Sequence, residues 1–138
     1  MDWQDFEVLI RDLLKHEFSN ENCKVEVTRA SRDAGVDAIA FDEDPIRGGK
    51  YVIQAKRYNN IVPLSAVRDL YGTVMNEGAV KGILVTTSYY GKDALEFVKD
   101  KPLKLINGEE LVYMFNKYGY NMKIELAKKQ KAQSKINY

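Results

Sequence analysis

The sequence predicts an α/β sandwich with a mixed central sheet and helices on both faces. Three patterns indicate this class: apolar residues recur at helical spacing, other segments alternate in the manner of strands, and one short segment is almost entirely apolar. Taken along the chain, the segments follow the order α-β-β-β-α-β-α-β-α. Such interleaving of strands and helices is typical of layered α/β domains.

Four segments have the apolar spacing of helices. In the first, six apolar side chains fill one arc of about 140° when the segment is projected at 100° per residue. Pro63 suits the first position of the second helix, and Gly78 suits the position just after its end. In the third helix, Ala94, Leu95 and Val98 are expected to face inward. The four helices are expected over residues 3–18, 63–77, 92–99 and 109–116.

Five segments have the patterns of strands. A polar connection containing Gly48 and Gly49 joins the second and third, so these two are expected to form an antiparallel hairpin. The fourth is nearly all apolar, which is typical of a strand buried within a sheet. Because a helix separates it from the third, a right-handed crossover should make those two strands parallel. The strands are expected over residues 24–31, 36–41, 51–58, 81–87 and 103–106.

Composition limits the class of protein. A chain of 138 residues with 45% hydrophobic and 30% charged residues fits one soluble globular domain. The net charge of +1 does not by itself indicate a nucleic-acid-binding protein. The sequence has no long apolar run and no basic-then-apolar leader, so we expect neither a membrane span nor a secretion signal. The single cysteine, Cys23, cannot form an intrachain disulfide, which favours a cytoplasmic location.

The C-terminal part of the sequence differs from the rest. From Lys123 onward it is basic, polar and only weakly amphipathic. We therefore expect one domain over residues 1–118 and a basic C-terminal helix or flexible tail over residues 119–138. Lysines in this segment would attract any polyanion, a nucleic acid included, without sequence preference.

Polar side chains converge at one end of the predicted hairpin. Asp37 alternates with Ile39 and Phe41, and Gln54 and Lys56 stand two apart on the next strand. Residues two apart share a face of a strand, about 6.5–7 Å from each other. A carboxylate on such a strand is costly unless it is paired or binds a metal. The alternatives are an aspartate hydrogen-bonded to a loop and a lysine at an exposed edge.

These residue types suit a metal ion and a phosphate. A hard cation such as Mg²⁺ takes oxygen ligands, which the side chains of Asp37 and Gln54 and the main-chain carbonyl of Ala55 offer. Lys56 cannot bind a metal while protonated. It would instead hold a phosphate oxygen, orient an attacking water or stabilise the negative charge that grows during displacement.

The first helix carries one further acid. Glu7 projects at the margin of the apolar stripe, beside Trp3 and Leu14. It is either a boundary residue that reaches water or an acid aimed into a site beside the sheet. His16, the only histidine, sits late in this helix and is expected to be exposed or helix-terminal rather than catalytic.

The aspartate followed by Gln-x-Lys resembles the active site of the PD-(D/E)XK nuclease superfamily. More narrowly, the chain is similar to the Mrr-like catalytic domain of type IV restriction endonucleases, over about residues 3–115. The resemblance implies a restriction-endonuclease-like α-β-β-β-α-β sandwich. The matching segments are Phe6-Glu7, Asp33-Ala34-Gly35-Val36-Asp37, Gln54-Ala55-Lys56-Arg57-Tyr58, the helix with Gly72, and Gly82-Ile83-Leu84-Val85-Thr86-Thr87-Ser88.

The resemblance also implies roles for individual residues. Asp37 would be the acidic metal ligand, Gln54 would replace the more usual acid, and Lys56 would be the catalytic lysine. Glu7 matches the first-helix acid that often completes such sites, directly or through water. The implied activity is metal-dependent endonucleolytic hydrolysis of DNA, with Mg²⁺ as the cofactor and Mn²⁺ as a substitute. The neutral Gln54 should lower metal affinity relative to a glutamate.

Residues expected to contact DNA flank this site at strand ends and loops, where basic and hydroxyl side chains reach phosphates. They are Arg32, Arg57, Thr87, Ser88 and Lys92. A solvated surface residue is the alternative for each. Two other functions stay open: a non-catalytic DNA- or partner-binding module on the same fold, and a nuclease for branched DNA. The sequence also leaves open a homodimer and a separate recognition subunit or domain.

Overall fold

The computed structural model describes residues 3–18, 22–27 and 35–119 of the chain. The strands are β1 (Cys23–Val27), β2 (Gly35–Asp42), β3 (Gly49–Lys56), β4 (Lys81–Thr86) and β5 (Leu103–Ile106). The helices are α1 (Trp3–Glu17), α2 (Leu64–Glu77), α3 (Lys92–Phe97) and α4 (Gly108–Lys117), and the 3-10 helix η1 (Val98–Asp100) follows α3.

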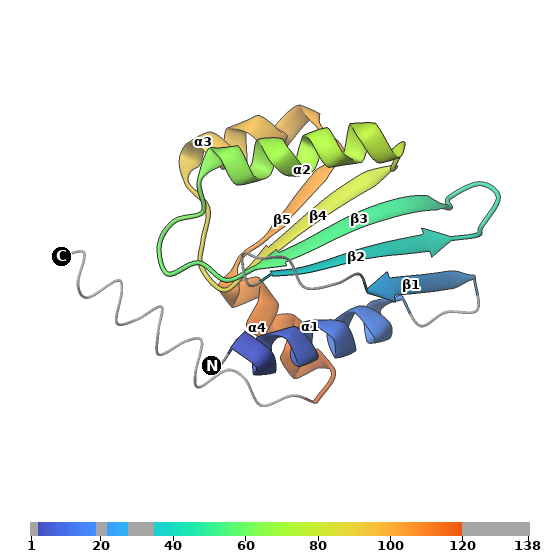
Figure 1. Ribbon diagram of the computed structural model, residues 1–138, viewed down its shortest axis with the longest axis horizontal. Helices are drawn as coiled ribbons and strands as arrows, with labels where there is room; N and C mark the ends of the chain where they lie inside the picture. The colour runs from blue at the N-terminus through green and yellow to red at the C-terminus, as the bar shows by residue number, and fades with distance from the viewer. Residues whose placement is uncertain (1–2, 19–21, 28–34, 120–138) are drawn as a thin grey trace.

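The five strands form one mixed sheet in the order β1-β2-β3-β4-β5. β1, β2 and β3 pair antiparallel, whereas β3, β4 and β5 pair parallel. Figure 1 shows α2 and α3 on one face of the sheet and α1 and α4 on the other. The predicted α/β sandwich with a mixed sheet is therefore confirmed. None of the helices in the described ranges has the length and apolar character needed to cross a bilayer.

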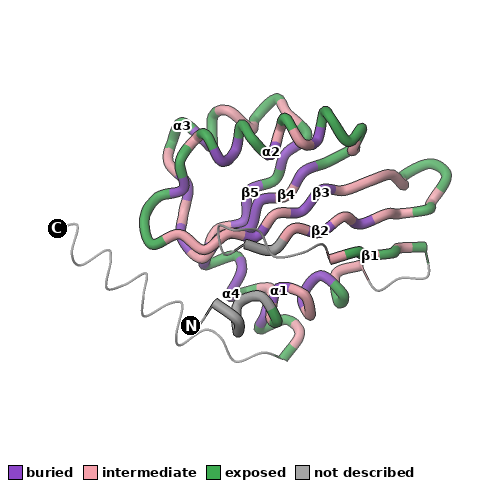
Figure 2. The backbone as a smooth tube through the Cα atoms, viewed as in Figure 1, coloured by how far each residue is buried: buried purple, intermediate pink, exposed green. Residues whose placement is uncertain are grey.

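Two hydrophobic cores lie on the two faces of the sheet. On one face, Ile53 and Val85 pack with residues of α1 and α4, among them the fully buried Phe115. On the other, Val52 and Leu84 pack beneath α2. Figure 2 shows buried backbone concentrated along β3, β4 and β5. Burial on both faces explains the almost continuous apolar sequence of β4.

Local sequence sets the ends of the helices. Gly78 ends α2 in the left-handed conformation, with φ of 63°, and its N–H donates to the carbonyls of the last turn. Pro63 caps the start of α2 instead of being its first residue. Asn107 begins α4 through a capping box, in which its side chain accepts from the Glu110 N–H at 2.9 Å. The predicted boundaries of these helices thus hold to within one residue.

The prediction that Leu95 faces inward is wrong. Leu95 is 50% exposed, whereas its neighbour Ala94 is fully buried. A helix turns by about 100° per residue, so the six-residue α3 can bury Ala94 without burying the next residue. The predicted strand over residues 24–31 is observed only as far as Val27, and its remainder lies outside the described residues.

Two glycines provide a test of the packing between α2 and β4. A Cβ on Gly82 would lie 2.5 Å from Val74 Cγ2 and 3.0 Å from Leu103 Cδ2, whereas a Cβ on Gly72, exposed on α2, would meet nothing within 4 Å. Gly82→Ala should therefore lower the free energy of unfolding by about 1–3 kcal/mol through overpacking. Gly72→Ala should raise it by about 0.5–1 kcal/mol through helix propensity. Urea denaturation measures both; equal effects of the two substitutions would contradict this packing.

Candidate active site

The register of the hairpin brings the predicted site residues together. β2 and β3 pair so that Asp37 stands opposite Gln54 and Gly35 stands opposite Lys56. Directly opposed residues of an antiparallel pair point to the same face, with Cβ atoms about 4.5–5.5 Å apart. Residues two apart on one strand also share a face. The side chains of Asp37, Gln54 and Lys56 therefore lie on a single face of the sheet.

That face is the one covered by α2. Ile53 and Ala55 pack on the side of α1 and α4, whereas Val52 packs beneath α2, so Gln54 points to the α2 side. α2 contacts β3 and β4, while Asp37 on the neighbouring β2 stays half-buried. The three polar residues thus lie at the margin of the area that α2 covers.

The cluster also lies at a particular end of the sheet. Lys56 ends β3 and is the register partner of Thr86, which ends β4. Because β3, β4 and β5 are parallel, their carboxyl ends meet at one edge, where the antiparallel β2 begins. Figure 1 shows the loops after β3 and β4 at this end, together with the start of α1. Ligands of open α/β sheets bind outside the carboxyl ends of the strands.

The side-chain oxygen of Gln54 is buried and, within the described part of the chain, accepts no hydrogen bond. Its register neighbour on β4 is the fully buried Leu84, which offers no donor side chain. Leaving a buried acceptor unpaired costs about 1–3 kcal/mol. A carboxylate and an amide oxygen on one face are hard oxygen donors, the type that divalent cations such as Mg²⁺ take. The donor set of Asp37 and Gln54 therefore fits a divalent metal ion.

Two further metal ligands are predicted, the Ala55 carbonyl and Glu7. Among the described residues, no group of three or more His, Cys, Asp or Glu is arranged to hold a metal ion. The carbonyl of Ala55 stays a predicted ligand. Glu7 belongs to α1, which packs on the opposite face of the sheet, and its side chain lies outside the described residues. Because Asp37 and Gln54 lie on the other face, Glu7 could bind the same metal ion only around the end of the sheet.

Lys56 is half-buried, and within the described ranges it forms no ion pair. Some other lysines of the sheet are paired. Lys50, on the same strand and face, pairs with Glu77 of α2 at 2.5 Å. The charge of Lys56 is therefore available for a negatively charged ligand at the end of the sheet, beside Asp37 and Gln54.

The residues expected to contact DNA have different surroundings. Arg57 follows β3 and is half-buried, Lys92 begins α3 and is exposed, and Arg32 lies outside the described residues. The Thr87 hydroxyl donates to the Tyr58 carbonyl at 3.5 Å. Ser88 is only 2% exposed, and its hydroxyl donates to a main-chain carbonyl, that of residue 60, at 2.6 Å. The hydrogen of the Ser88 hydroxyl is therefore engaged within the protein.

One further buried residue, Tyr90, lies at this end of the sheet, and sequence reasoning missed it. The Tyr90 hydroxyl lies 2.9 Å from the Leu84 carbonyl and 3.0 Å from the Ile106 carbonyl, so it can donate to the end of β4 or of β5. Burial raises the pKa of Tyr90 well above its usual value. The phenol therefore keeps the proton that it donates. A tyrosine soon after a buried strand is the only sequence signal, and it is weak.

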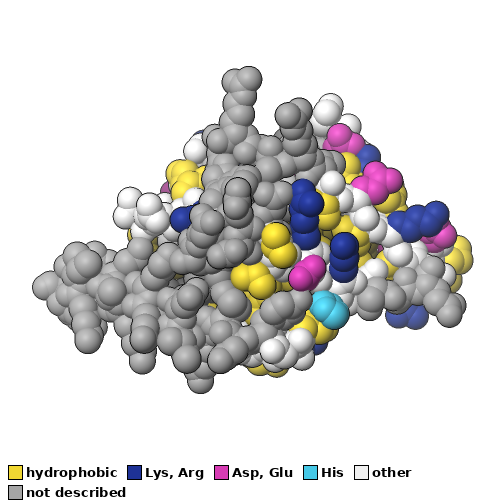
Figure 3. All heavy atoms as spheres, turned by 60° about the horizontal axis from the view of Figure 1, so that its bottom comes forward, with side chains coloured by type: hydrophobic (Ala, Val, Ile, Leu, Met, Phe, Trp, Pro, Cys, Tyr) yellow, Lys and Arg dark blue, Asp and Glu magenta, His cyan; other side chains and the backbone are white. Residues whose placement is uncertain are grey.

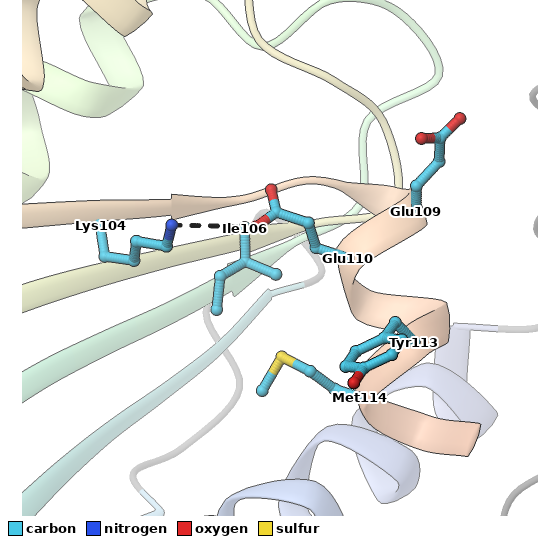
Figure 4. A pocket seen from close by; sticks show the side chains of 6 residues that line it. All are labelled: Lys104, Ile106, Glu109, Glu110, Tyr113 and Met114. Atoms are coloured by element: carbon cyan, nitrogen blue, oxygen red, sulfur yellow. Dashed lines mark ion pairs between the residues drawn. The ribbon is translucent and has the colours of Figure 1, made fainter. Parts of the chain in front are cut away.

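A cavity of about 360 Å³ lies elsewhere, beside β5 and α4. Figure 4 shows its lining, in which Lys104 and Glu110 form an ion pair at 3.8 Å across the side chain of Ile106. Ile106 belongs to the core shared with α1 and α4. The cavity therefore adjoins the opposite face of the sheet from Asp37 and Gln54 and is separate from the candidate site.

Figure 3 shows the molecule from the side of α1 and α4. The described basic side chains on this face are interspersed with acidic and hydrophobic ones. Phosphate binding is favoured by basic residues gathered in one area. The described part of this face therefore shows no gathering of basic side chains that would suit a DNA backbone.

Comparison with known proteins identifies the family. Residues 1–115 match the family model Mrr_cat, described as a restriction endonuclease. The chain belongs to this restriction endonuclease family. It is 29% identical over 112 residues to the type IV methyl-directed restriction enzyme EcoKMrr of Escherichia coli strain K12. That alignment covers 79% of the chain and 36% of EcoKMrr. Membership of the Mrr_cat family implies use of a divalent metal ion.

Solved structures of restriction endonucleases share the fold. The DNA modification-dependent restriction endonuclease AspBHI matches with a TM-score of 0.65 and 25% identity, covering 89% of the chain and 33% of AspBHI. The MspJI restriction endonuclease, solved with a 27-mer oligonucleotide, matches with a TM-score of 0.54 and 17% identity over 90% of the chain and 31% of MspJI. The chain thus spans about a third of the length of each relative.

The unpaired oxygen of Gln54 predicts a gain in stability when it is removed. In EDTA, Gln54→Met should raise the free energy of unfolding by about 1 kcal/mol, because it removes a buried, unpaired amide oxygen and leaves an apolar side chain of similar length. Added Mg²⁺ should then raise the Tm of the unsubstituted chain but not that of the variant. Urea denaturation and thermal melting measure these effects. A fall of more than about 1 kcal/mol in EDTA would mean that the amide has an internal partner.

Proposed function

We propose that this chain is a metal-dependent DNA endonuclease that hydrolyses phosphodiester bonds, with Mg²⁺ as the cofactor. The observation that carries the proposal is the shared face of Asp37, Gln54 and Lys56, on which the Gln54 oxygen is buried and unpaired. Membership of the Mrr_cat family supports it independently. Mn²⁺, which also takes oxygen ligands, would substitute for Mg²⁺.

Each side chain has a distinct task in this proposal. Asp37 and Gln54 hold the cation through a carboxylate and an amide oxygen, and the Ala55 carbonyl and Glu7 are further candidate ligands. When bound, the metal lowers the pKa of a coordinated water and offsets negative charge on the phosphate. The Lys56 ammonium binds a non-bridging phosphate oxygen and stabilises the charge that develops there. The oxygen of a water molecule would bond to phosphorus while one P–O ester bond breaks. The attacking water would lose one proton to solvent, and the departing deoxyribose oxygen would take one proton from solvent, so that the step balances.

The names of two relatives support a class of substrate. EcoKMrr is named as methyl-directed and AspBHI as DNA modification-dependent, which supports modified duplex DNA as the substrate of this chain. Arg57, which follows β3, and Lys92, which begins α3 after the loop that follows β4, would contact the DNA backbone. A separate recognition subunit or domain would supply specificity, and a homodimer would present two sites to the two strands.

Removing the lysine or the aspartate should abolish cleavage. Lys56→Met and Asp37→Asn are expected to lower the rate of nicking of supercoiled plasmid by at least about 10²-fold, because each removes a charge that acts on the reacting phosphate or the metal. Matched controls are Lys81→Met, at the exposed start of β4, and Asp69→Asn, on the exposed side of α2. These should cleave at the unsubstituted rate. Circular dichroism checks that all four variants fold.

Retained cleavage in both site variants would exclude this site. Plasmid binding in a gel-shift assay with no cleavage in Mg²⁺ or Mn²⁺, relative to an EDTA control, would favour a non-catalytic binding module. The same assay on methylated, unmethylated, single-stranded and branched DNA separates a modification-dependent enzyme from a structure-specific nuclease. We expect methylated duplex DNA to be cut fastest.

Charge at position 54 should control metal dependence. Gln54→Glu adds one negative charge beside Asp37, so the Mg²⁺ concentration that gives half-maximal cleavage should fall roughly tenfold, a change of about 1.4 kcal/mol in binding. Titration of cleavage with Mg²⁺ measures this concentration. An unchanged midpoint would place the metal away from Gln54.

A further inference from the structure

Two buried hydroxyl residues stand next to the proposed catalytic lysine. Thr86 is 0% and Ser88 is 2% exposed, and in the described part of the chain they are the buried polar side chains. Thr86 is the register partner of Lys56. Because Val85 packs toward α1 and α4 while Leu84 packs beneath α2, Thr86 points to the same face as Lys56. Buried hydroxyls are costly unless they are hydrogen-bonded, so their partners indicate their role.

Every polar group of Ser88 is bonded within the protein. Its N–H donates to the Thr86 hydroxyl oxygen at 3.2 Å, and its carbonyl accepts from the N–H of Gly108, the first residue of α4, at 2.8 Å. Its hydroxyl donates to the Asn60 carbonyl at 2.6 Å. Ser88 therefore joins the end of β4, the start of α4 and the segment that follows Lys56.

The segment that follows Lys56 is bonded to the loop after β4. Residues 57–62 connect β3 to α2 without forming a helix, and Val62 forms an isolated β-bridge with Tyr90, outside the named strands. Three hydrogen bonds join this segment to the loop after β4: the Ser88 bond to the Asn60 carbonyl, the weaker Thr87–Tyr58 bond at 3.5 Å, and the bond from the Val62 N–H to the carbonyl of residue 89 at 3.0 Å. All three partners follow Thr86 directly.

We propose that Thr86 and Ser88 are positioning residues, which fix residues 57–62 and thereby hold Lys56 in place relative to Asp37 and Gln54. The effect on cleavage rests on the proposed nuclease function, whereas the effect on the segment does not. Lys56 is the last residue of β3, so its backbone is constrained on one side by the sheet and on the other by this segment. A displacement of about 1 Å of a catalytic group can cost about 10²-fold in rate.

This role differs from a direct contact with DNA. The single hydrogen of the Ser88 hydroxyl is donated to Asn60, and the side chain is buried. A residue that acts through the protein changes the rate of the chemical step, whereas a phosphate contact changes DNA affinity. The two roles are therefore separable by experiment.

Hydrogen exchange on the metal-free full chain tests the structural part. Ser88→Ala and Thr86→Val remove one donor and one acceptor, and the amide of Val62 should exchange at least tenfold faster in both. Thr86→Ser, which keeps the hydroxyl, and Ser65→Ala, a matched loss of a hydroxyl at an exposed position of α2, should stay within twofold of the unsubstituted chain. Protection of the β4 amides reports whether a variant has unfolded as a whole. Ser88→Cys, with a similar size and a weaker donor, replaces Ser88→Ala if that variant does not fold.

Single-turnover cleavage and DNA binding test the consequence for the reaction. Ser88→Ala and Thr86→Val should cleave at least tenfold more slowly at saturating protein, with the Kd for DNA changed less than twofold, and Thr86→Ser should restore the rate. Unchanged exchange of Val62, or a loss that appears only in the Kd for DNA, would overturn the positioning role. If the unsubstituted chain cleaves no DNA, the nuclease proposal fails, and hydrogen exchange alone decides whether these residues hold the segment.

Discussion

The antiparallel register of β2 and β3 is the constraint on which the candidate site depends. It sets Asp37 opposite Gln54, and the alternation of side chains then puts Lys56 on the same face. A slip of one residue between the strands would turn Asp37 toward the core on the side of α1 and α4. The small residues Ala38 and Ala40, buried in that core, favour the observed register, because a carboxylate in their place would lose its hydration without an evident partner.

The candidate site also depends on the parallel strands β3, β4 and β5. Together with α2 they form the packed layer at whose edge the three polar side chains lie. The crossover through α2 brings β4 beside β3, and Gly82 permits close contact with Val74 and Leu103. α2 covers β3 and β4, and the half-buried Gln54 lies at the margin of that cover with its side-chain oxygen buried. Its unpaired oxygen is a local cost in stability, and costs of this kind are commonly retained where a ligand offsets them.

Much of the fold could be predicted from particular residues. Gly78 and Asn107 mark helix ends because their backbone and side-chain preferences are local, and the apolar run of β4 marks a strand buried on both faces. Leu95 was misassigned because the face that a short helix buries depends on what packs against it. Of the site, alternation along β3 predicted that Gln54 and Lys56 share a face, whereas the register that sets Asp37 opposite Gln54 comes from the structure. The contact of Ser88 with Asn60 could not be predicted, because its acceptor is a main-chain carbonyl, which every residue carries.

The sequence by itself determined the elements, their order and the chemistry of the three polar side chains, because hydrophobic periodicity and residue type are properties of the chain alone. Only the tertiary structure decided that the Gln54 oxygen is buried without a partner, that α1 and its Glu7 belong to the opposite layer, and that Ser88 is bonded to the segment after Lys56. These features arise from contacts between residues distant in sequence, and burial and hydrogen bonding depend on such contacts rather than on local preference.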